Sequence, residues 1–221
     1  MTQYRVTHNP ATGERIQYVV TGLESRGTLV RYRWTSDAGG TIVAHIHPGS
    51  TETFTILEGE ATLKVEATTL VLRPGQTAVV PAGTVHSERN VSGRVVRGIV
   101  ELAPASKTAE LHDALAGMAT DLPHGPTGAP RNLLQLGATF WYFRNDLRAV
   151  SPPVWLQNLF LPVLAGLAKV AGVAPFRPQW DSRLVEQTDE WAPLFDEHDY
   201  PVALERAGYT FDITEPRRSL S

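Results

Sequence analysis

The chain has 221 residues, of which 42% are hydrophobic and 19% charged, with a formal net charge of -3 and no cysteine. This length lies near the upper end of one domain, and the hydrophobic content is enough for a sizeable core. The weakly acidic balance argues against a basic surface that binds nucleic acid. The absence of cysteine excludes disulfides, cysteine-ligated zinc and thiol nucleophiles, so histidine and carboxylates are the candidate metal ligands.

The first 13 residues are polar and lack the unbroken apolar core of a secretory signal. We therefore expect a cytoplasmic protein.

Residues 29–102 alternate short β-branched or aromatic runs with Gly and Pro turns, a pattern typical of a β-sandwich or β-barrel. Three turns support this interpretation. Glu58-Gly59 fits a tight hairpin, Pro74-Gly75 fits a type II turn, and Pro81-Ala82-Gly83 fits a further turn. No internal repeat is present, which argues against a second barrel.

Beyond Pro104 the pattern becomes helical. We predict a first helix over residues 107–119 with Ser106 as its cap, and a second over residues 132–148. Ser151-Pro152-Pro153 opens a third helix, which Gly172 ends.

These patterns divide the chain into a β-barrel over residues 1–104 and a helical extension over residues 105–221 that packs on the barrel or on a dimer partner. From about residue 174 the extension has no clear period, and we expect an irregular wrap or a partly disordered tail.

The third helix has the length of a membrane span, but its polar residues and Pro162 favour a buried helix of a soluble protein, so we expect no membrane contact. Its apolar side chains run nearly round the helix, which implies burial on several sides. Packing against the barrel or a dimer partner is one interpretation, and a lid over the barrel mouth is the other.

Three histidines and one glutamate have the spacing of a metal site. His45 and His47 lie two apart in an alternating strand, so both side chains point to one face of the sheet. Glu52 follows after a short turn, and His86 lies near the start of a later strand. Three nitrogens and one oxygen suit one divalent transition metal ion, namely Fe, Mn, Co, Ni, Cu or Zn.

These residues carry a family resemblance. The stretch Gly39-x5-His45-x-His47-x4-Glu52-x6-Gly59 resembles the first motif of the cupin superfamily, and Gly75-x5-Pro81-x-Gly83-x2-His86-x3-Asn90 resembles the second. The opening NPATGERI is similar to that of many bacterial single-barrel cupins. The resemblance implies a mainly β fold with a jelly-roll barrel, the four ligands His45, His47, Glu52 and His86, and a homodimer.

Strand alternation also predicts the residues that line a substrate pocket. Val43, Phe54 and Ile56 are expected to face the interior with the ligands, and Tyr32 and Trp34 line the mouth if their strand has that register. Such an interior suits a small, largely apolar organic molecule with an oxygen that reaches the metal.

Two functions are open at this point. One is a metal-dependent enzyme, either a dioxygenase-like oxygenase or a related isomerase, cyclase or decarboxylase. The other is a non-catalytic module that binds, stores or senses a small ligand, because one fold hosts both roles. A nucleotide-sugar isomerase is disfavoured, since only Arg31 and Arg33 are candidates to bind a diphosphate.

Overall fold

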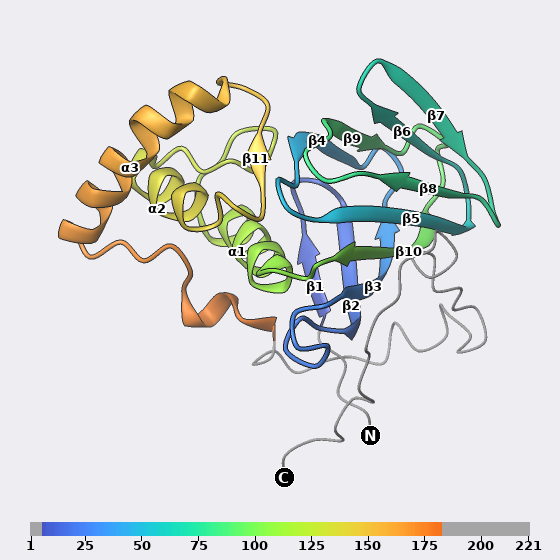
Figure 1. Cartoon of the computed structure of the whole chain (residues 1–221), viewed down its shortest axis with the longest axis horizontal. Coiled ribbons are helices and arrows are strands. Elements are labelled where there is room, and N and C mark those ends of the chain that lie inside the picture. Colours follow the sequence, from blue (N-terminus) through green and yellow to red (C-terminus); the bar gives the residue numbers. More distant parts are fainter. Residues whose placement is uncertain (1–5, 183–221) are drawn as a thin grey trace, which may run out of the picture.

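The computed structural model describes residues 6–182 and shows two antiparallel sheets followed by a helical extension (Figure 1). The first sheet has the strand order β1 (Val6–Asn9), β2 (Glu14–Val20), β3 (Val30–Ser36), β10 (Val96–Ala103), β5 (Thr51–Glu58) and β8 (Thr77–Val80). The second has the order β11 (Arg148–Ala149), β4 (Thr41–Ile46), β9 (His86–Arg89), β6 (Ala61–Val65) and β7 (Thr68–Leu72). From β3 to β10 the chain crosses repeatedly between the two sheets, which is the predicted jelly-roll barrel.

The eight strands expected from residues 29–102 are present, and the turns between them behave as predicted. In the second turn, Gly75 has a φ of 82°, and the N–H of Gln76 donates to the carbonyl of Arg73 at 2.9 Å. This is the type II geometry that favours Pro74 and Gly75 at its two central positions. β1, β2 and β11 were not predicted as strands.

The barrel core lies between the two sheets. Its buried side chains come from the inward faces of both sheets and include Ile16, Tyr18, Tyr32, Trp34, Phe54, Ile56, Leu63, Val80, Val100 and Leu102. Phe54 and Ile56, which were expected to face the interior, and Tyr32 and Trp34, which were expected at the mouth, are all at most 4% exposed.

Three helices follow the barrel: α1 (Thr108–Asp121), α2 (Leu133–Tyr142) and α3 (Val154–Val170), with a short turn η1 (Pro178–Trp180) after them. Asn132 caps α2 by accepting from the N–H groups of Leu134 and Gln135. Ser106 does not cap α1, which corrects that prediction. Its φ is 47° and its side chain makes no cap contact, because the first helical turn begins one residue later, after Lys107.

α3 ends as predicted. Gly172 adopts a φ of 72° and donates to Lys169, and Val173 donates to Ala168 at 2.8 Å, a Schellman ending that needs a left-handed residue. Within residues 6–182, no helix is both long and apolar enough to cross a membrane.

A second small core joins α1, α2 and η1. It contains Leu111, Met118, Phe143 and Trp180. The extension therefore folds around its own core, and most of the tail predicted from residue 174 lies outside the described residues.

Candidate metal centre

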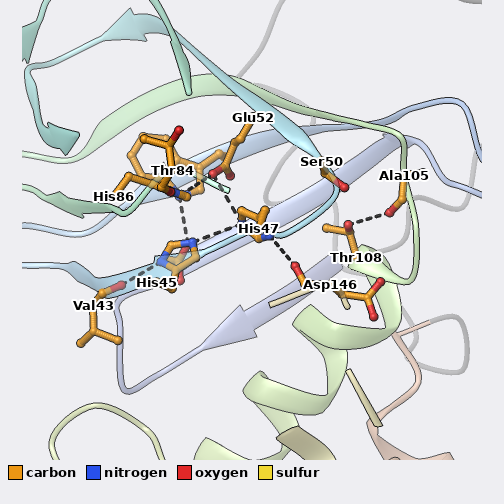
Figure 2. A network of polar contacts seen from close by, with 12 residues as sticks. Val43, His45, His47, Ser50, Glu52, Thr84, His86, Ala105, Thr108 and Asp146 are labelled. Atoms are coloured by element: carbon orange, nitrogen blue, oxygen red, sulfur yellow. Dashed lines mark hydrogen bonds and ion pairs between the residues drawn. The ribbon is translucent and has the colours of Figure 1, made fainter. Parts of the chain in front are cut away.

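Four side chains from three strand regions meet inside the barrel (Figure 2). His45 lies on β4 and His47 follows it directly, Glu52 lies on β5, and His86 begins β9. All four are between 2% and 6% exposed. One ligand atom from each lies within 4.8 Å of all the others, and no other such group of three or more is found among residues 6–182.

Backbone pairing fixes this convergence. His45 pairs directly with His86 across β4 and β9. Gly83, with a φ of 78°, donates its N–H to the carbonyl of His47 at 2.9 Å and so ties the turn before β9 to the end of β4. A side chain at this position would be strained, which explains the glycine.

Val43 does not face the interior, so that prediction is wrong. Its side chain is 43% exposed, whereas Ile42 packs against the core. The cause is a register shift between Ile42 and His45 in the β4–β9 ladder. Such a bulge adds one residue and reverses the alternation of side chains before it.

The hydrogen bonds of the three histidines determine which ring nitrogens are free. Nδ1 of His45 contacts the carbonyl of Val43 at 2.8 Å, Nδ1 of His47 that of Asp146 at 2.7 Å, and Nδ1 of His86 that of Thr84 at 3.0 Å. A carbonyl oxygen only accepts, so each Nδ1 carries the hydrogen. Each ring therefore turns its Nε2 towards the centre, and Nε2 carries a free lone pair in any ring that is neutral.

This arrangement leaves lone pairs facing one another. Nε2 of His45 lies 3.1 Å from Nε2 of His47, and Oε2 of Glu52 lies 2.7 Å from Nε2 of His86 and 3.5 Å from Nε2 of His47. Two bare nitrogens at this distance repel unless a cation or a proton lies between them. The donor set fits a divalent transition metal, whose ligands in proteins are neutral imidazole nitrogens and carboxylate oxygens.

The pKa shifts of His45, Glu52 and His86 also favour a bound cation. Burial, followed by the neighbouring His47 and His86, lowers the pKa of His45 to about 3. Burial alone would raise the pKa of Glu52, but the three histidines lower it to about 2, so it stays ionised. Burial opposes protonation of His86, yet Glu52 raises its pKa overall. Glu52 therefore places a fixed negative charge in the cluster, which favours a cation beside it, either a proton on His86 or a metal ion.

Comparison with known proteins agrees with the motifs and the fold. Residues 32–112 match the family model described as a cupin domain. The chain contains a cupin domain. A 79-residue stretch is 35% identical to quercetin 2,3-dioxygenase of Bacillus subtilis (strain 168) and covers 35% of this chain. It spans only 23% of that relative's length.

Solved structures also resemble the cupin domain. The cupin domain of Cnp3 from Schizosaccharomyces pombe is 20% identical, with 41% of this chain and 64% of that chain covered and a TM-score of 0.39. A predicted oxalate decarboxylase from Thermotoga maritima is 16% identical, with 47% and 93% covered and a TM-score of 0.42.

The helical extension completes the surroundings of the cupin site. The loop after α2 supplies the Asp146 carbonyl to His47, and β11 pairs with β4 at Ile46 and His45. The Asp146 carboxylate also accepts from the N–H of Lys107 at 2.8 Å, which anchors the loop at the start of α1. The extension thus holds one ligand ring in position from outside the barrel.

Two further carboxylates lie within the barrel. Glu14 on β2 accepts from the Thr12 hydroxyl at 2.8 Å and from Trp34 Nε1 at 3.2 Å, and burial raises its pKa to about 7. Glu88 on β9 is 2% exposed, and burial followed by the charge of Glu14 raises its pKa to about 8. Glu14 therefore titrates near neutral pH, whereas Glu88 largely keeps its proton there.

Sequence reasoning missed these groups for different reasons. Glu88 lies two residues from His86, so strand alternation puts both side chains on one face, and this signal was present in the sequence. Glu14 lies on a strand that was not predicted. Asp146 acts through its backbone carbonyl, for which the sequence carries no side-chain signal.

The remaining candidates have structural contacts. Arg31 pairs with Glu101 at 2.6 Å, and Arg33 donates to Gln17 at 2.9 Å. Both lie on the face of β3 opposite Tyr32, so neither points into the barrel. The Asn90 amide donates to three backbone carbonyls, of Ser36, Asp37 and Arg94, and so joins the loops around β9.

Proposed function

We propose that His45, His47, Glu52 and His86 hold one divalent transition metal ion and that the chain is a metal-dependent oxygenase of a small, largely apolar organic molecule. One observation carries this proposal. Three imidazole Nε2 atoms and an ionised carboxylate converge in a buried site, and no lysine or arginine is among them. When bound, the ion would supply Lewis-acid and redox chemistry to a substrate oxygen.

The protein residues have distinct parts in this proposal. The carbonyls of Val43, Thr84 and Asp146 hold the imidazole rings in the orientation that presents Nε2. Glu52 provides the negative charge that offsets part of the charge of a divalent cation. Because backbone carbonyls orient the imidazole rings, we expect side-chain substitutions to change metal binding mainly at the four ligand residues themselves.

Tyr32 supports the proposal of an organic substrate beside the metal. Burial, followed by the charges of Glu52 and Glu14, raises the pKa of Tyr32 well above its usual value. It therefore stays a neutral phenol, which is able to donate a hydrogen bond to a substrate oxygen. Phe54 and Trp34, with rings 6.1 Å apart, supply an apolar wall.

The relative supports the class of reaction. Quercetin 2,3-dioxygenase is named for an aromatic substrate, and the matched stretch is 79 residues long. The proposed substrate class is accordingly an aromatic or enolic compound that carries a hydroxyl or carbonyl oxygen. The choice among oxygenase, isomerase, cyclase and decarboxylase rests on this similarity alone.

The test is dioxygen consumption by protein loaded separately with Fe, Mn, Co, Ni, Cu or Zn. Each form is incubated with a panel of flavonols, catechols and 1,3-dicarbonyl compounds, and products are identified by mass spectrometry. We expect turnover with at least one metal and one compound class, and its loss in His86→Ala. His8→Ala, an exposed histidine outside the cluster, is the matched control.

Two results would contradict the proposal. Metal-dependent binding of panel compounds, detected by thermal shift, without turnover for any metal would favour a non-catalytic ligand-binding module. Metal-dependent conversion without dioxygen uptake would reject an oxygenase in favour of an isomerase, cyclase or decarboxylase.

A further inference from the structure

The outer face of α3 exposes a row of large apolar side chains. Trp155, Leu159, Phe160, Val163, Leu167 and Val170 are between 54% and 89% exposed. The opposite side of the helix packs inward through Leu161 and Ala168. Figure 1 shows α3 at the outer edge of the extension, beyond α2 and away from the barrel. The burial on several sides expected for this helix is therefore not provided by residues 6–182.

The size of this surface is unusual for a monomer. Residues of this size have on the order of 150–250 Å² of surface each, so at these exposed fractions the six together expose on the order of 600–950 Å². Monomeric proteins rarely expose a contiguous apolar patch above about 300–600 Å². A standard protein interface buries about 800 Å² on each partner. The α3 face therefore provides most of the surface that a stable dimer needs.

The spacing of the row indicates that its partner is a helix. The half-buried Leu156 and four exposed members of the row, Phe160, Val163, Leu167 and Val170, follow one another at intervals of four, three, four and three residues. This is the heptad spacing that forms the seam between two packed helices. Gly166 lies on the same exposed side, and no atom lies within 4 Å of the position its Cβ would occupy, so another backbone has room to approach.

The charges on the helix select among partners. Lys169 is the single charged residue of α3. Helices that lie on membrane surfaces are instead rich in Lys and Arg along their polar face. An uncharged apolar face complements itself, which is the requirement for a two-fold interface between identical chains.

We propose that two copies of the chain associate through an antiparallel pair of α3 helices, with the two-fold axis near Val163. The heptad row is centred on Val163, so an antiparallel pair buries its full length. The two Lys169 side chains then lie roughly 18 Å apart along the axis, whereas a parallel pair would bring them together. This inference is independent of the metal centre and of the proposed function.

The test uses the absence of cysteine from the chain. Val163→Cys is expected to form a disulfide with its own copy under mild oxidation, seen as a doubled mass on a non-reducing gel. Val170→Cys is the matched control, because it is more exposed, at 89%, but lies roughly 20 Å from its copy in the antiparallel pair. Crosslinking of both variants would overturn the antiparallel arrangement, and crosslinking of neither would overturn the interface.

Light scattering on the unmodified full chain provides the second measurement. We expect about twice the chain mass of 24.2 kDa at tens of micromolar. Phe160→Glu is expected to shift the protein to a monomer without changing its far-ultraviolet circular dichroism or metal content. A monomeric wild type, or a dimer that survives Phe160→Glu, would overturn the proposal. A monomer that sediments with phosphatidylcholine–phosphatidylglycerol vesicles through α3 would replace it with a membrane-binding face.

Discussion

Replacement of Glu14 by Gln should change how the stability of the protein depends on pH. Burial raises the pKa of this carboxyl from 4.5 to about 7. The folded protein thus holds the proton more tightly than the unfolded chain. The resulting stability is fully present below pH 4.5 and is lost as the pH rises through about 7.

The magnitude follows from the two pKa values. Each pH unit between them is equivalent to about 1.4 kcal/mol, so ionisation of Glu14 costs about 3 kcal/mol at high pH. Gln does not titrate, and its amide oxygen still accepts from Trp34 while its amide nitrogen faces the Thr12 hydroxyl. Because about 0.8 kcal/mol is already lost at pH 5, the free energy of unfolding of Glu14→Gln, relative to wild type, should rise by about 2.5 kcal/mol between pH 5 and pH 8.5.

The assay is urea unfolding of chelator-treated protein at these two pH values, followed by tryptophan fluorescence. Glu88 loses its proton in the same direction, so some pH dependence remains in the variant, and only the difference between variant and wild type is used. Glu60→Gln, at a glutamate whose side chain is 39% exposed, is the control and should show no difference. An equal difference in unfolding free energy at both pH values would refute the desolvation of Glu14.

Two further substitutions test the packing that supports the site. Glu101→Ala leaves the charge of Arg31 buried without its 2.6 Å partner, and it should lower the free energy of unfolding by about 3–5 kcal/mol in urea titrations. Glu60→Ala removes one partner of an exposed pair and should lower it by less than about 1 kcal/mol. Equal losses in the two variants would contradict a buried ion pair at Arg31 and Glu101. Gly137→Ala places a Cβ 2.3 Å from the Cβ of Leu164 and should lower the melting temperature. An unhindered Gly→Ala change in a helix stabilises a protein by about 0.5–1 kcal/mol. A raised melting temperature would therefore show that α2 and α3 are not closely packed at this position.

The sequence predicted the barrel and the ligand cluster because both depend on local rules. Alternation placed His45 and His47 on one face, and left-handed glycines such as Gly75 and Gly83 marked the turns between strands. Strand alternation failed at Val43, where a bulge shifts the register of β4. A bulge depends on pairing with a distant strand, so local sequence does not reveal it.

The contribution of the helical extension could not be predicted for a related reason. β11 is two residues long and exists only because it pairs with β4, and the Asp146 carbonyl reaches His47 across 99 residues of sequence. The division into barrel and extension, the homodimer and the cytoplasmic location stay predictions.

Metal content tests the central claim most directly. Purified protein is incubated with each divalent metal, desalted and measured by inductively coupled plasma mass spectrometry, for wild type, His45→Ala, His47→Ala, Glu52→Gln, His86→Ala and the control His8→Ala. We predict about one ion per chain in wild type and control, and a marked loss in each of the four ligand variants. Wild-type protein that retains no ion of any kind, or ligand variants that retain as much as wild type, would contradict a metal centre at these four residues.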